Sequence, residues 1–252
     1  MHLPKWAKIW YNIKRIEGGS AYEISIDRRI GTAGACIARR AGRSAVGFGA
    51  AVLEKNKVMN LTAITDPAQA AELHLLDSLT LLKVLPLAGK SLLDVGTGAG
   101  FPGVPLKLAE PSLRLTLLDS LQKRMRWLEE EALPALGVEA RFLTGRAEDF
   151  ARDNREKFDV VTSRAVARLD LLCELCLPFV HRDGYFLAMK GALAKVELHE
   201  AANAIRLLGG SYERTEEFEI GGAVHSVIVI HKTGKTPEQY PRSWARMKQK
   251  PL

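Results

Sequence analysis

The segment SLLDVGTGAGFPG, residues Ser91–Gly103, joins a short apolar strand to a turn that is rich in glycine. The strand is predicted over Ser91–Val95, and the acidic residue Asp94 lies near its carboxyl end. Three glycines follow at alternate positions: Gly96, Gly98 and Gly100. Because glycine has no Cβ atom, the chain can turn sharply here and its backbone can approach a ligand closely. A helix is predicted next, over Val104–Glu110, so the stretch is typical of a nucleotide-binding corner.

Two kinds of nucleotide fit this corner. Residues 98–103, GAGFPG, match the G-x-G-x-x-G fingerprint of dinucleotide-binding proteins. The longer pattern that starts at Asp94 is closer to the adenosylmethionine corner of class I methyltransferases. Asp119 ends the next predicted strand, Leu113–Leu118, where a carboxylate accepts both hydroxyl groups of an adenosine ribose. Since Asp119 serves both interpretations, a nicotinamide-dependent oxidoreductase stays open as an alternative.

Strand and helix patterns alternate along the chain, which is the order expected of a doubly wound α/β fold. Seven strands are predicted, at Ser91–Val95, Leu113–Leu118, Glu139–Leu143, Phe158–Ser163, Gly184–Lys190, Tyr212–Ile220 and Val224–His231. Helices are predicted over Ala68–Val84, Val104–Glu110, Gln122–Leu136, Leu169–Val180 and Leu193–Leu208. We therefore expect a mostly parallel, seven-stranded, Rossmann-like sheet.

Three regions are predicted along the 252 residues: an N-terminal extension over 1–66, a methyltransferase domain over 67–231, and a basic C-terminal tail over 232–252. The tail is rich in proline, lysine and arginine and is predicted to be a loop. Residues 31–50, GTAGACIARRAGRSAVGFGA, have no sustained period, and glycine at this density is unfavourable inside a helix. No element is assigned to that segment.

The net charge of +7 is concentrated at the two ends of the chain. Residues 1–57 hold 11 lysines and arginines against 4 acidic residues, and residues 232–252 hold 6 against 1. The middle holds 19 against 24 and is therefore mildly acidic. Basic ends of this kind bind the phosphate backbone of a nucleic acid, or are ordinary solvated tails.

The sequence also argues against several classes of protein. It contains no run of 18 apolar residues that would span a membrane, and its N-terminus does not resemble a secretory signal. The three cysteines, Cys36, Cys173 and Cys176, are too few and too odd in number for a disulfide framework. The pair Cys173 and Cys176 has no second pair at ligand spacing, so no metal site is assigned. These features predict a cytoplasmic protein.

The residues at the end of the fourth predicted strand indicate which atom a methyl transfer would modify. Methyl transfer from a sulfonium is an in-line displacement that depends mainly on alignment. The strand ends in Thr162-Ser163-Arg164-Ala165, which offers neither the cysteine that carbon-5 of a pyrimidine needs nor the Asn/Asp-Pro-Pro-aromatic motif used for the adenine amine. Nitrogen-7 of guanine carries a lone pair and needs no general base, so that target fits the arginine found here.

From about Val52 to Leu252 the chain resembles the RsmG (GidB) family of bacterial ribosomal RNA methyltransferases. The resemblance rests on short motifs in the order and spacing of the family: NLT at 60–62, His74-x-x-Asp77-Ser78, DVGTGAGFPG, LLDSLQKR, GRAED, SRAVA, MKG and the ending TPEQYPR…KPL. It implies 7-methylation of one guanine in small-subunit (16S) ribosomal RNA, with S-adenosylmethionine (SAM) as the methyl donor. The segment before residue 51 departs from the family, either through a reading-frame or start-site error or through divergence.

The resemblance also implies which residues form the site. The expected cofactor-binding residues are Gly96, Phe101, Ala147, Glu148 and Arg164, joined by Asp119 from the ribose argument above. Arg164 is also the expected catalytic residue. The expected RNA-binding residues are Asn60, His74, Lys123, Arg124 and Lys190.

The partner follows from the same resemblance. We expect a monomer that acts on 16S ribosomal RNA or on the small ribosomal subunit, without a metal and without a membrane. Two alternatives remain: a methyltransferase of another RNA or of a small molecule, and a non-catalytic RNA-binding protein with a vestigial SAM pocket.

Overall fold

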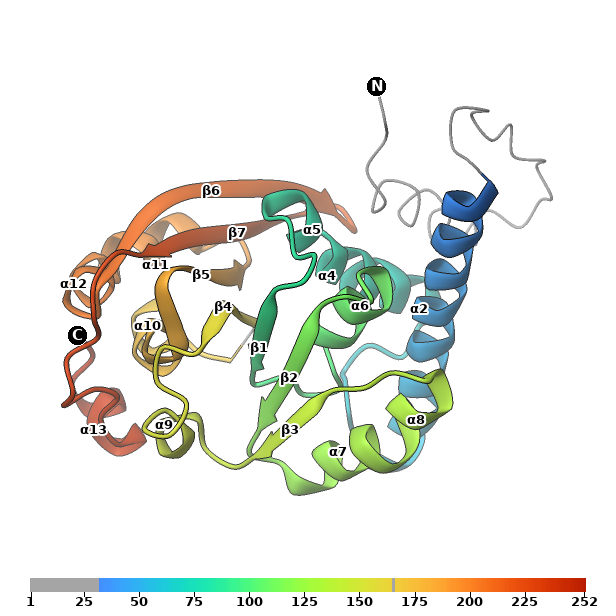
Figure 1. The fold of residues 1–252 in the computed structure, drawn as a ribbon, viewed down its shortest axis with the longest axis horizontal. Coiled ribbons are helices and arrows are strands. Elements are labelled where there is room, and N and C mark those ends of the chain that lie inside the picture. Colours follow the sequence, from blue (N-terminus) through green and yellow to red (C-terminus); the bar gives the residue numbers. More distant parts are fainter. Residues whose placement is uncertain (1–31, 165) are drawn as a thin grey trace.

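The computed structural model describes the backbone of residues 32–164 and 166–252. Sequence-based expectations for residues 1–31 lie outside this range. The described part is built on one sheet of seven strands with helices on both faces (Figure 1). Among these residues, no helix is long and apolar enough to cross a membrane.

The strand order is β3-β2-β1-β4-β5-β7-β6. The strands are β1 (Ser91–Val95), β2 (Arg114–Asp119), β3 (Arg141–Thr144), β4 (Phe158–Arg164), β5 (Val180–Lys190), β6 (Gly210–Ile220) and β7 (Ala223–Lys232). Strands β1 to β5 pair in parallel, whereas β7 is antiparallel to both β5 and β6. The prediction of a mostly parallel, seven-stranded, doubly wound sheet is confirmed.

Two hydrophobic cores lie on the two faces of the sheet. The helices of the first face are α2 (Thr32–Met59), α3 (Pro67–Ala70), the π-helical segment Ala71–Leu76, α4 (Asp77–Leu79), α5 (Leu81–Val84), α6 (Gly103–Ala109), α7 (Gln122–Trp127), the π-helical segment Leu128–Ala132 and α8 (Leu133–Leu136). Those of the second face are α9 (Ala147–Phe150), α10 (Leu169–Cys176), the 3-10 turn Leu177–Phe179, α11 (Ala194–Glu200), α12 (Ala202–Leu207) and α13 (Trp244–Gln249).

The strand order reverses between β1 and β4, which neighbour each other although β2 follows β1 in sequence. In open α/β sheets, ligands bind outside the carboxyl ends of the strands at such a switch point. The glycine turn follows β1 and Arg164 ends β4, so the topology places both at this point.

Helix α2 includes most of the segment for which the sequence predicted no element. Its side chains Phe48 and Val52 are buried in the first core. A Cβ atom on Gly49 would lie only 3.2 Å from Cδ1 of Leu75, so the glycine allows a close approach of the two helical segments. Tertiary packing of this kind supplies most of the stability of a helix in a protein, and it outweighs the low helix propensity of glycine here.

The C-terminal tail is a second correction to the sequence-based prediction, because residues 232–252 are not a simple loop. They include helix α13, and Met247 of this helix is fully buried. Lys232 is also fully buried, and its Nζ donates hydrogen bonds of 3.0 Å to the carbonyl oxygens of Leu177 and Leu208. Part of the basic charge of the tail therefore serves the fold and is not available to an RNA.

Replacing Lys232 with methionine should lower the free energy of unfolding by about 3 kcal/mol at neutral pH, because two buried carbonyl groups lose their donor. Burial lowers the pKa of Lys232 from 10.5 to about 8. Between these two values the unfolded chain holds the proton more tightly than the folded chain, so the contribution of Lys232 to stability should rise with pH. Denaturant unfolding checks this, with the exposed Lys235→Met as control; equal losses in the two variants would contradict it.

Candidate cofactor and substrate site

The glycine turn after β1 has the backbone that its sequence predicted. Gly96 and Gly98 have φ angles of +73° and +58°, a region that favours glycine. A Cβ atom on Gly96 would lie 2.3 Å from Cγ2 of Val166, so no side chain fits there without movement. The amides of Gly96 and Thr97 donate to the carbonyl oxygen of Leu118, which fixes the turn against β2.

Asp94 stabilises the glycine turn through hydrogen bonds to residues at both ends of it. The carboxylate is fully buried, and its Oδ2 accepts hydrogen bonds from Thr97 Oγ1 at 2.7 Å and from the Gly103 amide at 2.9 Å. Its Oδ1 has no hydrogen-bond partner within the described part of the chain. Burial raises the pKa of Asp94 to about 6, which still leaves it charged at neutral pH. A buried negative charge of this kind favours a cationic ligand at the turn.

Asp119, at the end of β2, connects the turn to the next loop. Its Oδ2 accepts the amide of Gly98 and its Oδ1 accepts the amide of Leu121, both at 2.9 Å. A carboxylate oxygen has more than one acceptor position. Asp119 therefore orders the glycine turn and still has acceptor capacity for a ribose.

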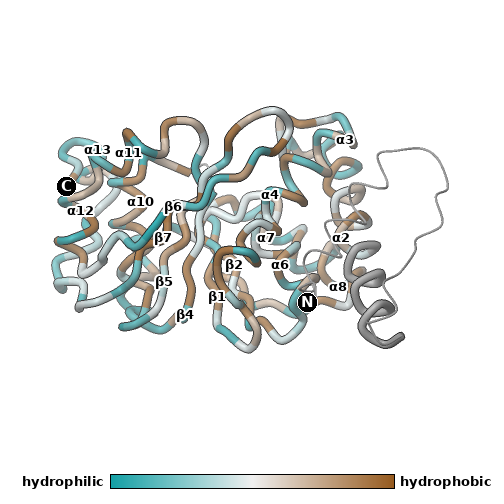
Figure 2. Tube along the Cα trace, turned by 90° about the horizontal axis from the view of Figure 1, so that it is seen from above, coloured by the Kyte–Doolittle hydropathy of each residue, from teal (hydrophilic) through white to brown (hydrophobic). Residues whose placement is uncertain are grey.

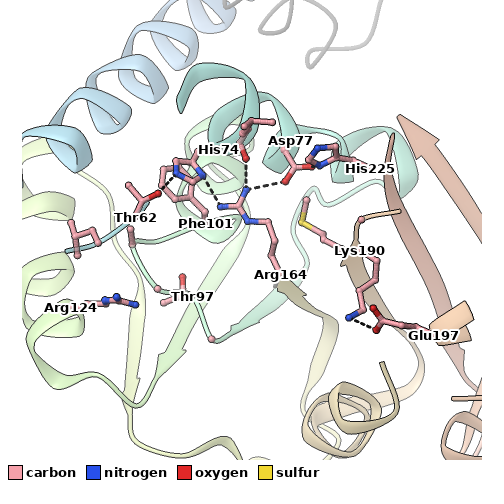
Figure 3. Close-up of a pocket in the computed structure, with 17 residues that line it drawn as sticks. Thr62, His74, Asp77, Thr97, Phe101, Arg124, Arg164, Lys190, Glu197 and His225 are labelled. Atoms are coloured by element: carbon pink, nitrogen blue, oxygen red, sulfur yellow. Dashed lines mark hydrogen bonds and ion pairs between the residues drawn. The ribbon is translucent and has the colours of Figure 1, made fainter. Parts of the chain in front are cut away.

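Two cavities meet at the glycine turn. The central cavity, about 600 Å³, extends toward the helical segment 71–79 and the end of β5 (Figure 3). The side cavity, about 360 Å³, extends along the end of β2 toward α9 and α13. Both cavities are lined by Gly96, Gly98, Arg124 and Arg164. The turn and the two arginines thus lie where a long ligand would pass from one cavity into the other.

Arg164 is the centre of the polar network in the central cavity (Figure 3). Its Nη1 lies 3.0 Å from the Leu73 carbonyl oxygen and 3.0 Å from Oδ2 of Asp77. Its Cζ lies 5.3 Å from the ring centroid of Phe101, which is cation–π distance. The guanidinium is therefore fixed in position by a buried carboxylate, a backbone oxygen and an aromatic ring.

His74 packs on the same ring, with the two ring centroids 4.8 Å apart. Its Nε2 lies 2.8 Å from Thr62 Oγ1, and its Nδ1 lies 3.4 Å from Arg164 Nη2. Because arginine has only donors, Nδ1 is the acceptor and Nε2 carries the proton. Burial, with the nearby Arg164 charge as the second cause, lowers the pKa of His74 to about 4. The imidazole is therefore neutral at physiological pH.

Asp77 contacts two basic side chains, Arg164 and His225, through its two carboxylate oxygens. Its Oδ2 accepts from Arg164, and its Oδ1 lies 2.9 Å from Nδ1 of His225 on β7. The hydrogen bond to Asp77 raises the pKa of His225 above its usual value. Of these three side chains, that of Asp77 is the most buried, with 5% of its surface exposed. Asp77 therefore fixes the positions of Arg164 and His225 at the cavity.

An ion pair between Lys190 and Glu197 lines another wall of the central cavity. Lys190 Nζ lies 2.6 Å from Glu197 Oε2 and donates to the Ala167 carbonyl oxygen at 2.7 Å. Glu197 Oε2 also accepts the Leu169 amide at 2.8 Å. The pair places a hydrogen-bond donor and an acceptor side by side in the cavity.

Most of the predicted site residues lie around these two cavities. The central cavity is lined by Gly96, Phe101, Arg164, His74, Arg124 and Lys190, and the side cavity by Asp119, Ala147 and Glu148 as well as Gly96 and Arg164. Asn60 lies outside both, in a third cavity beside α2, and its carbonyl oxygen accepts from Arg124 Nη2 at 2.9 Å. Lys123 is exposed and lines none of the three.

Several lining residues were not among the predicted site residues, and they include Thr62, Glu197, His225 and Trp244, which have polar or aromatic side chains. His225 reaches the cavity because β7 runs antiparallel to β5 with Ser226 opposite Lys190. Trp244 begins the helix that the sequence did not predict. If the last strand is taken as antiparallel to its neighbour, His225 falls beside the MKG motif, and this signal could have predicted His225. The sequence contains no comparable signal for Trp244.

Comparison with known proteins identifies the family that the chain resembles. Residues 43–225 match the model of a family described as rRNA small subunit methyltransferase G, or GidB. The ribosomal RNA small subunit methyltransferase G of Pelotomaculum thermopropionicum is 47% identical over 207 residues, which cover 80% of this chain and 86% of the relative. That of Clostridium kluyveri is 44% identical over 200 residues, covering 78% and 84%.

Solved structures show the fold. An O-methyltransferase from Bacillus cereus, in complex with SAH, matches with a TM-score of 0.56 at 15% identity and covers 74% of this chain and 91% of its own. TrmN from Thermus thermophilus matches with a TM-score of 0.50 at 23% identity, covering 62% and 48%. Both likenesses agree with the Rossmann-like sheet described above.

Proposed function

Because this chain belongs to the rRNA small subunit methyltransferase G family, we propose that it transfers a methyl group from SAM to nitrogen-7 of one guanine in 16S ribosomal RNA. The observation that carries the proposal is the joining of two cavities at the glycine turn, with Arg164 on both. The residues of one chain line both cavities, so we propose that the enzyme acts as a monomer. We also propose a cytoplasmic location, because ribosomal RNA is the proposed substrate.

The side cavity fits the adenosine part of SAM. Asp119 offers acceptors for ribose hydroxyls, and Ala147 begins α9, where the first amides have no partner inside the helix. Those amides would donate to ring nitrogens of adenine, and Glu148 would accept from its amine. The unpartnered Oδ1 of buried Asp94 suits the cationic methionine end. SAM would supply a methyl group on a positively charged sulfur, which is a good leaving group.

The central cavity fits the target guanine and the reacting methyl. The lone pair of guanine nitrogen-7 forms the new bond to carbon while the carbon–sulfur bond breaks, so the positive charge moves from sulfur to the base. No proton has to be removed. The carboxylates of Asp77 and Glu197 line this cavity and favour the charge that develops there. The protein therefore aligns the two reactants and stabilises the developing charge, and such a displacement needs no further catalytic group.

The pair Lys190 and Glu197 matches guanine and not adenine. Guanine presents an acceptor, O6, beside a donor, the N1–H group, whereas adenine presents a donor amine beside an acceptor. Lys190 would donate to O6, and Glu197 would accept from N1–H. Adenine would present its donor amine to Lys190 and its acceptor nitrogen to Glu197, so both hydrogen bonds to the base would be lost.

Replacing Glu197 with glutamine should lower kcat/KM for the RNA by at least about tenfold and leave the affinity for SAM unchanged, because the charged acceptor for guanine is lost. Steady-state kinetics at varied RNA concentration and calorimetric titration with SAM measure the two effects. Glu200→Gln, at an exposed position of the same helix, is the matched control. A variant with the kinetics of the wild type would remove Glu197 from the guanine contact.

The proposed function is tested by the transfer of labelled methyl groups. Purified chain and labelled SAM are incubated with 16S ribosomal RNA, with small ribosomal subunits, and with transfer RNA, all from a host that lacks this enzyme. We expect about one methyl group per 16S RNA, free or in the subunit, and none in transfer RNA. RNA binding without transfer would indicate the vestigial-pocket alternative, and equal labelling of all RNAs would indicate another substrate.

A further inference from the structure

The C-terminal helix α13 reaches the side cavity. Trp244, its first residue, lines that cavity together with Asp119, Ala147 and Glu148. In Figure 1, α13 lies beside α9 at the lower left of the molecule. Trp244 follows Gly100 of the glycine turn by 144 residues, so this wall of the cavity comes from a part of the chain far from the turn in sequence.

Trp244 is coupled to a predicted cofactor residue through Arg146. The guanidinium Cζ of Arg146 lies 5.1 Å from the indole ring centroid, within cation–π distance. Arg146 Nε in turn lies 3.1 Å from Glu148 Oε1. The indole therefore helps to hold the arginine that orients Glu148, and it stands on the same cavity itself.

The segment that carries Trp244 is fixed to the domain before any ligand binds. Arg242 pairs with the buried Glu174: its Nη2 lies 2.6 Å from Oε2, and its Nε lies 2.8 Å from Oε1. Met247 is fully buried in the second core. Arg155 donates to the carbonyl oxygens of Thr236 and Tyr240. The tryptophan is thus presented from a rigid support, which reduces the entropy that a ligand contact would cost.

We infer that Trp244, at the start of α13, binds the adenosine part of the cofactor and completes this wall of the cofactor site. The inference rests on the proposed function, because the ligand it names is SAM. The half-buried indole lines the cavity together with the carboxylates of Asp119 and Glu148, so it offers a purine base an aromatic surface beside polar groups. Aromatic contacts to a base commonly change affinity by about tenfold or more.

The experiment compares Trp244→Ala, Trp244→Phe and Lys248→Ala, the last at an exposed position of the same helix. Each variant is titrated in a calorimeter with S-adenosylhomocysteine (SAH) and with 5′-methylthioadenosine, which keeps the adenosine and lacks the amino-acid end. Trp244→Ala should weaken both ligands by the same factor, at least about tenfold. Trp244→Phe should stay within about threefold of the wild type, and Lys248→Ala should not differ from it.

Tryptophan fluorescence gives a second readout that does not depend on the stability of the alanine variant. SAH should change the emission of the wild type, and this change should be lost in Trp244→Phe. Wild-type affinity in Trp244→Ala, a loss for SAH without one for methylthioadenosine, or a full emission change in Trp244→Phe would each overturn the inference. A wild-type chain that binds neither ligand would instead overturn the proposed function.

Discussion

Arg164→Ala should lower the single-turnover rate of methyl transfer by at least about 100-fold, even when SAM and RNA are both saturating. The guanidinium lies between the two cavities and is fixed by Asp77, by the Leu73 carbonyl oxygen and by the Phe101 ring. Its removal takes away the group that positions the reactants and also leaves Asp77 buried with one partner fewer. A small misplacement of reacting atoms already costs a factor of this size.

The control for Arg164 has to separate positioning from stability. Asp77 and Arg164 form a buried pair, and breaking such a pair destabilises a fold by itself. Arg164→Lys keeps a charge next to Asp77 but loses the planar fork, so it should fold normally and still be slow. Rates are compared only under conditions in which denaturant unfolding shows that each variant is fully folded. A folded variant, Arg164→Lys or Arg164→Ala, that transfers methyl at the wild-type rate would show that Arg164 only pairs with Asp77.

Asp119→Ala should lower the affinity for SAM by at least about tenfold. The proposed contacts to the ribose are two charge-assisted hydrogen bonds, each worth about 1.5–3 kcal/mol. The variant also releases the amides of Gly98 and Leu121, so the glycine turn loses part of its support. Calorimetric titration with SAM measures the loss.

A ligand without the ribose hydroxyl separates the two contributions of Asp119. The wild type should bind 5′-methylthioadenosine more tightly than its 2′-deoxy analogue, and Asp119→Ala should bind the two equally. This comparison is a double-mutant cycle between the carboxylate and the hydroxyl group. If the variant still prefers the hydroxylated ligand by the full wild-type factor, Asp119 only supports the turn.

The parts of the fold that the sequence predicted are those with local causes. The glycine turn, the acid at the end of β2 and the alternation of strands and helices depend on residues close together in the chain. Helix α2 was missed because its stability comes from burying Phe48 and Val52 against the rest of the first core, a contact that local propensity does not contain. The helix in the tail was missed for the same reason: Arg242 and Glu174 are 68 residues apart.

The site residues divide in the same way, into those with local causes and those that depend on contacts distant in sequence. Arg164, Phe101 and the residues of the turn lie at strand ends that the fold class places together, so pattern and resemblance were sufficient to predict them. His225 and Trp244 come from β7 and from α13, whose positions depend on the antiparallel pairing of the last strands and on ion pairs distant in sequence. For Trp244, no motif in the sequence contains that information.

The central claim is tested most directly by mapping the methylated atom. Small-subunit RNA treated with the chain and SAM is reduced with borohydride and cleaved with aniline, a treatment that breaks the RNA at 7-methylguanosine. We predict one new cleavage, at a single guanine of 16S ribosomal RNA, which is absent when SAM is omitted and when Arg164→Ala replaces the wild type. Methyl groups incorporated without any such cleavage, or cleavage at many guanines, would contradict the account.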